Sequence, residues 1–185
     1  MQVKGLLIEP IYEFLRCRYG ESFLSKIFTH LSQKEEQVLH LKISTAMWYP
    51  YEFYIDLLNS IHSELNSESP EVMREMGVYA AEFALKTPYH LLFRFGTPKF
   101  LIRIGNKAYR TYFDEGKFKA FDLKDKSVLI KISQLSDIND LNFEIILGWM
   151  EGAFALTGGK NPRAILKEKY DKEEKYVIIK GTWDE

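Results

Sequence analysis

The sequence contains a single cysteine, Cys17, among 185 residues. One thiol cannot form an internal disulfide or the ligand set of a multi-cysteine metal site. The chain also lacks an excess of charge of either sign, because 25 basic side chains stand against 26 acidic ones. Nucleic-acid-binding domains usually carry a surplus of Lys and Arg for phosphate contacts. We therefore expect neither a nucleic-acid partner nor a cysteine-based metal centre.

Long apolar runs are absent as well. The most apolar stretch, FEIILGWMEGAFAL, contains Glu144 and Glu151 and is shorter than the roughly 20 residues that cross a bilayer. The N-terminal MQVKGLLIEP has neither the apolar core nor the small-residue cleavage site of a signal peptide. These features predict a cytoplasmic protein without membrane insertion.

The sequence does contain ample material for a core, since 46% of its residues are hydrophobic and 15% are aromatic. A chain of this length is expected to bury roughly 70% of the surface of its unfolded state. No repeat, low-complexity tract or linker divides it. We expect one domain spanning residues 1–185.

Residues 1–113 show the i, i+3, i+4 spacing of apolar side chains that is typical of amphipathic helices. The first such helix is expected to end at Gly20. It is expected to become regular near Glu9, because Pro10 is best tolerated in a first turn.

Two further helix starts are marked by a hydroxyl residue followed by proline. Ser69 before Pro70, and Thr97 before Pro98, are expected to be N-caps with proline at the first helical position. Thr87-Pro88 gives the same signal for a short helix between them.

The periodicity changes to an alternation of apolar and polar residues after Phe113, which indicates strands. Because two strand pairs flank one long helix, the order predicts an α+β fold. Its helical part would be residues 1–113 and its sheet-and-helix part residues 114–185, with the long helix crossing between the two hairpins of a four-stranded antiparallel sheet. The expected strands are 117–123, 126–132, 163–170 and 175–182, and the expected helix is 139–157.

Three blocks of the sequence, VKGLLIEPIYEFLRCRYG, EVMREMGVYAAEFAL and LGWMEG, resemble in content and order the corresponding blocks of heme-nitric-oxide/oxygen-binding (H-NOX) domains. The wider superfamily of nitric-oxide-signalling and Golgi-transport ligand-binding domains also includes four-vinyl-reductase domains and TRAPP subunits. The block STAMWYPYEFYIDLL most resembles uncharacterised myxobacterial paralogues in that superfamily.

The sequence departs from the H-NOX pattern at the two features that hold heme. The resemblance places Ala108 where H-NOX domains have the histidine that ligates the iron. In place of the Tyr-x-Ser-x-Arg clamp for the propionates stands ISQLSDINDLNFE, whose Asp137 and Asp140 would repel anions. The expected cofactor is therefore none, with heme disfavoured.

The stretch FLIRIGNKAYRTYF places four apolar positions on one helical face. By the resemblance, this face is the wall of an internal pocket. The expected function is a non-enzymatic, heme-free sensory or regulatory module that binds an apolar small molecule or lipid. The residues expected to line the pocket are Leu7, Leu101, Ile104, Ala108, Tyr112 and Leu147.

Two alternatives remain open. The first is a protein-interaction scaffold without a ligand, either a homodimer or a subunit of an assembly. The aromatic cluster at residues 48–54 would then be an exposed interface rather than a packing seam between helices. The second is a heme-based gas sensor in which His90 replaces the missing axial ligand.

The remaining candidate residues give little indication of catalysis or metal binding. Cys17, between Arg16 and Arg18, is either a reactive thiol or acylation site or a half-buried structural residue. Glu144 and Glu151 are about 10 Å apart along a helix, too far for joint acid–base catalysis, and Glu151 is expected to accept a hydrogen bond from a backbone amide or an arginine. No nucleophile–base pair indicates an enzyme. The histidines, which lack metal-binding spacing, are His30, His40, His62 and His90.

Overall fold

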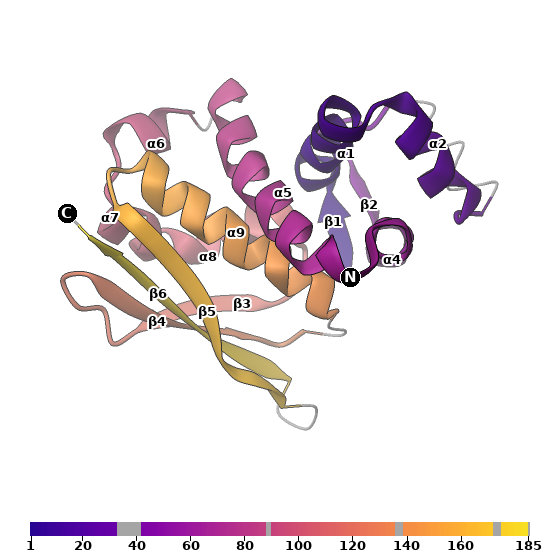
Figure 1. The fold of residues 1–185 in the computed structure, drawn as a ribbon. Helices are drawn as coiled ribbons and strands as arrows, with labels where there is room; N and C mark the ends of the chain where they lie inside the picture. Colours follow the sequence, from indigo (N-terminus) through magenta and orange to yellow (C-terminus); the bar gives the residue numbers. More distant parts are fainter. Residues whose placement is uncertain (33–41, 88–89, 136–138, 172–174, 185) are drawn as a thin grey trace.

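The computed structural model describes residues 1–32, 42–87, 90–135, 139–171 and 175–184. Helices and strands are arranged as an α+β fold (Figure 1), as the sequence predicts. One end of the molecule is formed by β1 (Gln2–Lys4), α1 (Gly5–Tyr19), α2 (Glu21–Thr29), β2 (Trp48–Pro50) and α4 (Tyr51–Leu65). The chain continues through η1 (Asn66–Glu68), α5 (Ser69–Phe83), η2 (Ala84–Lys86), α6 (His90–Phe95), α7 (Pro98–Arg103) and α8 (Gly105–Tyr112).

The C-terminal part is a four-stranded antiparallel sheet crossed by one long helix, as expected. The strand order is β3–β4–β6–β5, and α9 connects the two hairpins. Buried and half-buried residues alternate along β4, so one face of the sheet packs on the core. The bounds are β3 (Lys117–Phe121), β4 (Ser127–Ser133), α9 (Asp140–Leu156), β5 (Lys160–Asp171) and β6 (Tyr176–Asp184).

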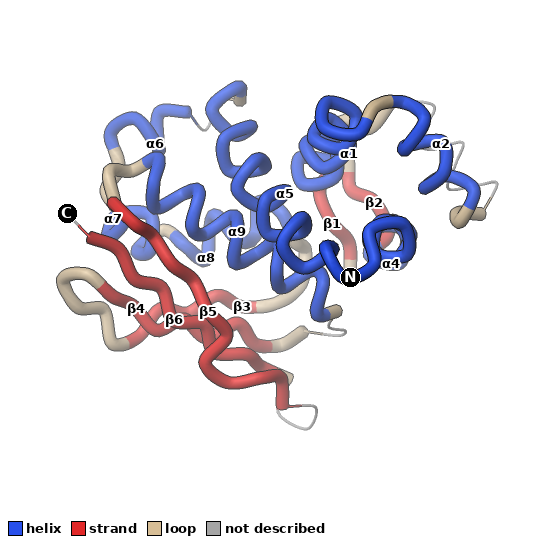
Figure 2. The backbone as a smooth tube through the Cα atoms, viewed as in Figure 1, coloured by secondary structure: helices blue, strands red, loops and turns tan. Residues whose placement is uncertain are grey.

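Helix α9 lies between α5 and the sheet (Figures 1 and 2). Its crossing with α5 is close because glycines meet there. A Cβ on Gly77 would lie 2.1 Å from the Ile145 carbonyl oxygen, and a Cβ on Gly148 would lie 1.9 Å from that of Arg74. The Gly77 and Gly148 positions belong to the blocks that resemble H-NOX domains, so the resemblance has a physical basis in helix packing.

The first helix begins earlier than the sequence predicts. Helix α1 starts at Gly5, whose amide donates to the Met47 carbonyl at 2.9 Å, and Pro10 lies inside it. The expected start near Glu9 is wrong, because the strand β1 runs directly into the helix and one missing amide does not break it. The predicted end is confirmed, since Gly20 has a φ of 81°.

The predicted helix starts are partly confirmed. Thr97 is an N-cap whose hydroxyl accepts from the Phe100 amide at 3.2 Å. Ser69 is instead the first residue of α5, with Glu68 as the N-cap, because a 3₁₀ turn leads directly into that helix. The stretch 100–113 is not one helix: Ile104, with φ −92° and ψ 5°, separates α7 from α8. Pro88 lies outside the described residues.

Two short strands in the N-terminal part were not predicted. Strands β1 and β2 pair antiparallel, and Val3 forms a bridge to Phe113. Three-residue strands are too short to show an alternation, so residues 1–113 were expected to be wholly helical, which is wrong. The core that joins the two parts is nonetheless continuous.

Three members of the aromatic cluster at residues 48–54 form a packing seam. Tyr51, Phe53 and Tyr54 are all buried, and the Tyr54 hydroxyl donates to the Asn142 side-chain oxygen at 3.0 Å. The interface hypothesis is therefore wrong for these three residues. In the described part of the chain, no helix has the length and hydropathy needed to cross a membrane.

Candidate ligand-binding pocket

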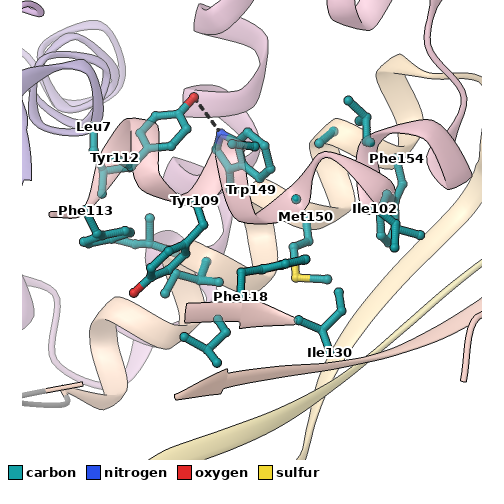
Figure 3. Close-up of a pocket in the computed structure, with 17 residues that line it drawn as sticks. Leu7, Ile102, Tyr109, Tyr112, Phe113, Phe118, Ile130, Trp149, Met150 and Phe154 are labelled. Carbon is teal, nitrogen blue, oxygen red and sulfur yellow. Dashed lines mark hydrogen bonds between the residues drawn. The ribbon is translucent and has the colours of Figure 1, made fainter. Parts of the chain in front are cut away.

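An apolar cavity lies between α8, α9 and the inner face of the sheet (Figure 3). Its volume is about 70 Å³. For comparison, an engineered apolar cavity of about 150 Å³ binds benzene. The residues lining it are Leu7, Leu101, Ile102, Gly105, Ala108, Tyr109, Tyr112, Phe113, Phe118, Ile130, Ile132, Ile145, Ile146, Trp149, Met150, Ala153 and Phe154.

Aromatic side chains occupy most of the space between these elements. Tyr112 meets Trp149 edge to face, with ring centroids 5.5 Å apart, and the Trp149 indole N–H donates to the Tyr112 hydroxyl at 3.3 Å (Figure 3). Tyr109 stacks on Phe113 at 5.0 Å. The Phe118 ring lies where a Cβ on Gly105 would be, at 2.2 Å. Such packing leaves a small residual cavity rather than an open chamber.

A second, larger hollow opens on the other side of Ala108. We call it the outer groove; it lies between α6, α7, α8 and α9 and has a volume of about 500 Å³. That volume lies within the roughly 300–1,000 Å³ typical of small-molecule sites. The residues of the outer groove are Leu91, Phe93, Phe100, Leu101, Ile104, Lys107, Ala108, Thr111, Tyr112 and Trp149.

The cavity and the outer groove share one wall. Leu101, Ala108, Tyr112 and Trp149 line both. The Tyr112–Trp149 pair therefore lies between the smaller space and the larger one.

The residues predicted for the pocket are distributed over both spaces. Leu7, Leu101, Ala108 and Tyr112 line the cavity, and Ile104 lines the outer groove. Leu147 is buried but lines neither, because it lies on a different face of α9 from Trp149.

The α9 residues of the pocket, among them Trp149, were not predicted. Their positions 145/146, 149/150 and 153/154 form an i, i+4 stripe, which was a usable signal.

The lining offers few groups that bind a metal. Among the described residues around the cavity none is His or Cys, and the side-chain atoms other than carbon are the Tyr109 and Tyr112 hydroxyls, the Trp149 indole nitrogen and the Met150 sulfur. Burial raises the pKa of Tyr109 well above its usual value, which disfavours the tyrosinate. The Tyr112 hydroxyl already accepts from Trp149.

The two other candidate side chains lie outside both spaces. His90 is exposed at the start of α6, where its Nδ1 hydrogen-bonds the Thr87 carbonyl at 2.9 Å. Cys17 is a free, exposed thiol on α1, so the hypothesis of a half-buried structural thiol is wrong.

The two glutamates of α9 are held by one arginine. Arg74 donates to Glu144 and to Glu151, both at 2.9 Å, and to the Ala164 carbonyl at 3.1 Å. The Ala164 amide donates back to Glu151 at 2.9 Å. The prediction that Glu151 accepts from an arginine or a backbone amide is confirmed. This network connects α5, α9 and β5 and has a structural role.

The described histidines have ordinary hydrogen-bond partners. His30 contacts Glu64 at 2.9 Å, and His62 bonds the Ser69 hydroxyl. Among the described residues no group of three or more His, Cys, Asp or Glu side chains is arranged to hold a metal ion. His40 and Asp137 lie outside the described residues.

No family model and no curated protein matches this sequence. Solved structures do match it over its whole length. The Fe(II) unliganded H-NOX protein from K. algicida has 16% identity and a TM-score of 0.73, with 98% of this chain and 97% of that chain covered. The H-NOX protein from S. oneidensis in the Fe(II)NO ligation state has 11% identity and a TM-score of 0.74, with 98% and 99% covered. An H-NOX structure from work on heme distortion has 11% identity and a TM-score of 0.68, with 98% and 95% covered. The chain has an H-NOX-like fold.

Proposed function

We propose that this protein is a heme-free, non-enzymatic regulatory module that binds an apolar small molecule in the outer groove. The observation that carries the proposal is the pair of spaces around Ala108: a cavity of about 70 Å³ on one side and an apolar groove of about 500 Å³ on the other. Few polar atoms line the groove, as is usual for sites that recognise apolar ligands. A bound ligand would contact the Tyr112–Trp149 pair and so act on α8 and α9 together.

The residues of this chain support the heme-free part of the proposal. A heme site needs a volume of the order of several hundred Å³, whereas the cavity measures about 70 Å³. The outer groove reaches that size, but its described lining residues include no His or Cys that could ligate the iron. The position that the resemblance assigns to the iron ligand carries a methyl group, Ala108. We infer that heme does not fit the residues present.

Heme sensing through His90 is the alternative that the fold of the solved neighbours favours. It requires His90 to leave the Thr87 carbonyl and enter a space that it does not line. It predicts a Soret band on adding hemin that the His90→Ala substitution abolishes. Persistence of the free-hemin spectrum removes this alternative.

Calorimetric titration with dodecanol, a neutral apolar probe, tests the ligand-binding part of the proposal. We expect one dodecanol per chain, and we expect Ala108→Trp to abolish binding because the indole fills the groove. The matched control is Ile165→Ala, which removes a side chain that is 52% exposed on β5, outside the groove, and should leave the affinity unchanged.

Absence of dodecanol binding, together with a stable dimer in native mass spectrometry, would contradict the proposal and favour the interaction scaffold. Equal binding by the wild-type chain and the Ala108→Trp variant would place the ligand elsewhere. A homodimer that binds dodecanol in the groove is compatible with the proposal, since the two properties are independent.

A further inference from the structure

The stretch that forms most of the outer groove has an unusual charge composition. Residues 83–113 contain no Asp or Glu, although the whole chain has 26 acidic residues. Helices α6, α7 and α8, which supply three walls of the groove, all lie in this stretch. The basic residues in it are Lys86, Arg94, Lys99, Arg103, Lys107 and Arg110.

The fourth wall brings no negative charge into the groove either. Helix α9 contributes Trp149, and its glutamates Glu144 and Glu151 are bound to Arg74. The described lining residues of the groove therefore include no carboxylate. An anion that enters it meets no repelling group.

Lys107 is the charged residue of the groove lining. Within the described part of the chain its ammonium has no carboxylate partner, whereas Lys99 pairs with Asp125 at 2.7 Å. The neighbouring Thr111 hydroxyl already donates to the Lys107 carbonyl at 3.1 Å. One cation at the edge of an otherwise apolar groove is suited to a ligand with one anionic end.

The remainder of the groove is suited to a hydrocarbon chain. Leu91 and Phe100 are 52% and 40% exposed at its edges, and Leu101, Ile104 and Trp149 lie along it. Covering these side chains removes apolar surface from water, which is favourable. Because four helices line this concave groove, it favours a single hydrocarbon chain over a flat lipid surface.

We propose that the ligand of the outer groove is a monomeric amphipathic anion of the alkyl carboxylate class. Its hydrocarbon chain lies along Leu101, Ile104 and Trp149, and its carboxylate pairs with the Lys107 ammonium. This inference rests on the proposed function, because it names the chemical class of the ligand for the same groove.

Three probes with the same chain and different head groups test the charge requirement: dodecanoate, dodecanol and dodecyltrimethylammonium, each below its micelle-forming concentration. Exposed ion pairs contribute little, so dodecanoate is expected to bind about three- to fivefold more tightly than dodecanol. Dodecyltrimethylammonium should bind more weakly than both. Dodecanoate binding no tighter than dodecanol binding would overturn the inference and leave the proposed function intact; failure of both to bind would overturn the proposed function itself.

Substitutions of Lys107 test whether this residue causes the preference for an anionic head group. Lys107→Ala should reduce dodecanoate affinity to the level of dodecanol without changing dodecanol affinity, and Lys107→Glu should reverse the preference in favour of dodecyltrimethylammonium. Lys26→Ala, on α2 at the opposite end of the molecule (Figure 1), is the matched control. An equal loss with Lys26→Ala would show a non-specific charge effect and contradict the assignment. Binding to phosphatidylglycerol vesicles without binding of monomeric dodecanoate would also overturn it, in favour of a membrane surface.

Discussion

Replacing Gly148 by alanine tests the helix crossing that positions α9, and with it one wall of the pocket. The added Cβ would lie 1.9 Å from the Arg74 carbonyl oxygen, whereas ordinary contact begins at 3.4 Å. A backbone carbonyl cannot rotate away, so α5 and α9 must separate. Overpacking of this kind typically costs about 1–3 kcal/mol, occasionally more, and the intrinsic gain from removing a helical glycine is about 1 kcal/mol. We expect a net loss of about 2 kcal/mol, because the overlap is large.

In a protein of this length, that loss should lower Tm by about 4–8 °C. Urea unfolding followed by circular dichroism measures the free energy directly. Gly77→Ala, whose Cβ meets the Ile145 carbonyl oxygen at 2.1 Å, should behave similarly. Gly152→Ala should cost less, because its nearest contact is the Ala81 side chain at 2.9 Å. The Gly77→Ala/Gly148→Ala double variant should lose less free energy of unfolding than the two single variants lose together, since one separation of α5 from α9 relieves both contacts. A Gly148→Ala protein at least as stable as wild type would show that the α5–α9 crossing accommodates a Cβ at this position.

Three further substitutions probe the core and the pocket. Arg74→Met leaves Glu144 and Glu151 without their cation and should lower the free energy of unfolding by about 1–3 kcal/mol; a change below about 0.5 kcal/mol in urea unfolding would contradict the structural role of the network. Burial raises the pKa of Tyr109 above its usual 10.0, so above pH 10 the unfolded chain releases a proton that the folded chain retains, and stability falls as pH rises. Tyr109→Phe should reduce this fall by about 1.4 kcal/mol per pH unit, and an unchanged slope between pH 10 and 11 would be evidence against the burial of that hydroxyl. Ala108→Trp should change the free energy of unfolding by less than about 1 kcal/mol, because the indole enters the outer groove, whereas a loss of about 3 kcal/mol would mean that Ala108 is packed on all sides.

The architecture of the C-terminal part was predictable because each of its elements has a strong local pattern. Strand β4 alternates buried and half-buried residues, which is the period-2 signal of a sheet with one core face. Gly158, with a φ of 91°, follows the end of α9, as the Gly-Gly pair after the long apolar helix indicates. By contrast, the pairing of β1 with β2 joins segments more than 40 residues apart through three residues each, and no local pattern encodes it.

The sequence allowed some of the residues that line the candidate site to be predicted, but it did not allow the volume of the site to be predicted. Leu101 on α7, and Ala108 and Tyr112 on α8, all line the pocket although the stretch is divided into two helices. The size of the cavity depends on how Phe118 and Trp149, from β3 and α9, pack against α8. Side chains from distant segments fill the space, and their conformations follow from the assembled core rather than from the periodicity of any one helix. For the same reason the outer groove, which needs α6 to pack against α9, was not anticipated.

We propose that the pocket of this H-NOX-like fold excludes heme and that an apolar ligand binds on its outer side. Titration of the purified protein with hemin, followed by absorption spectroscopy, distinguishes this proposal from heme binding. We predict that the spectrum stays that of free hemin at every protein concentration. A sharp Soret band that saturates at one hemin per chain would contradict the proposal.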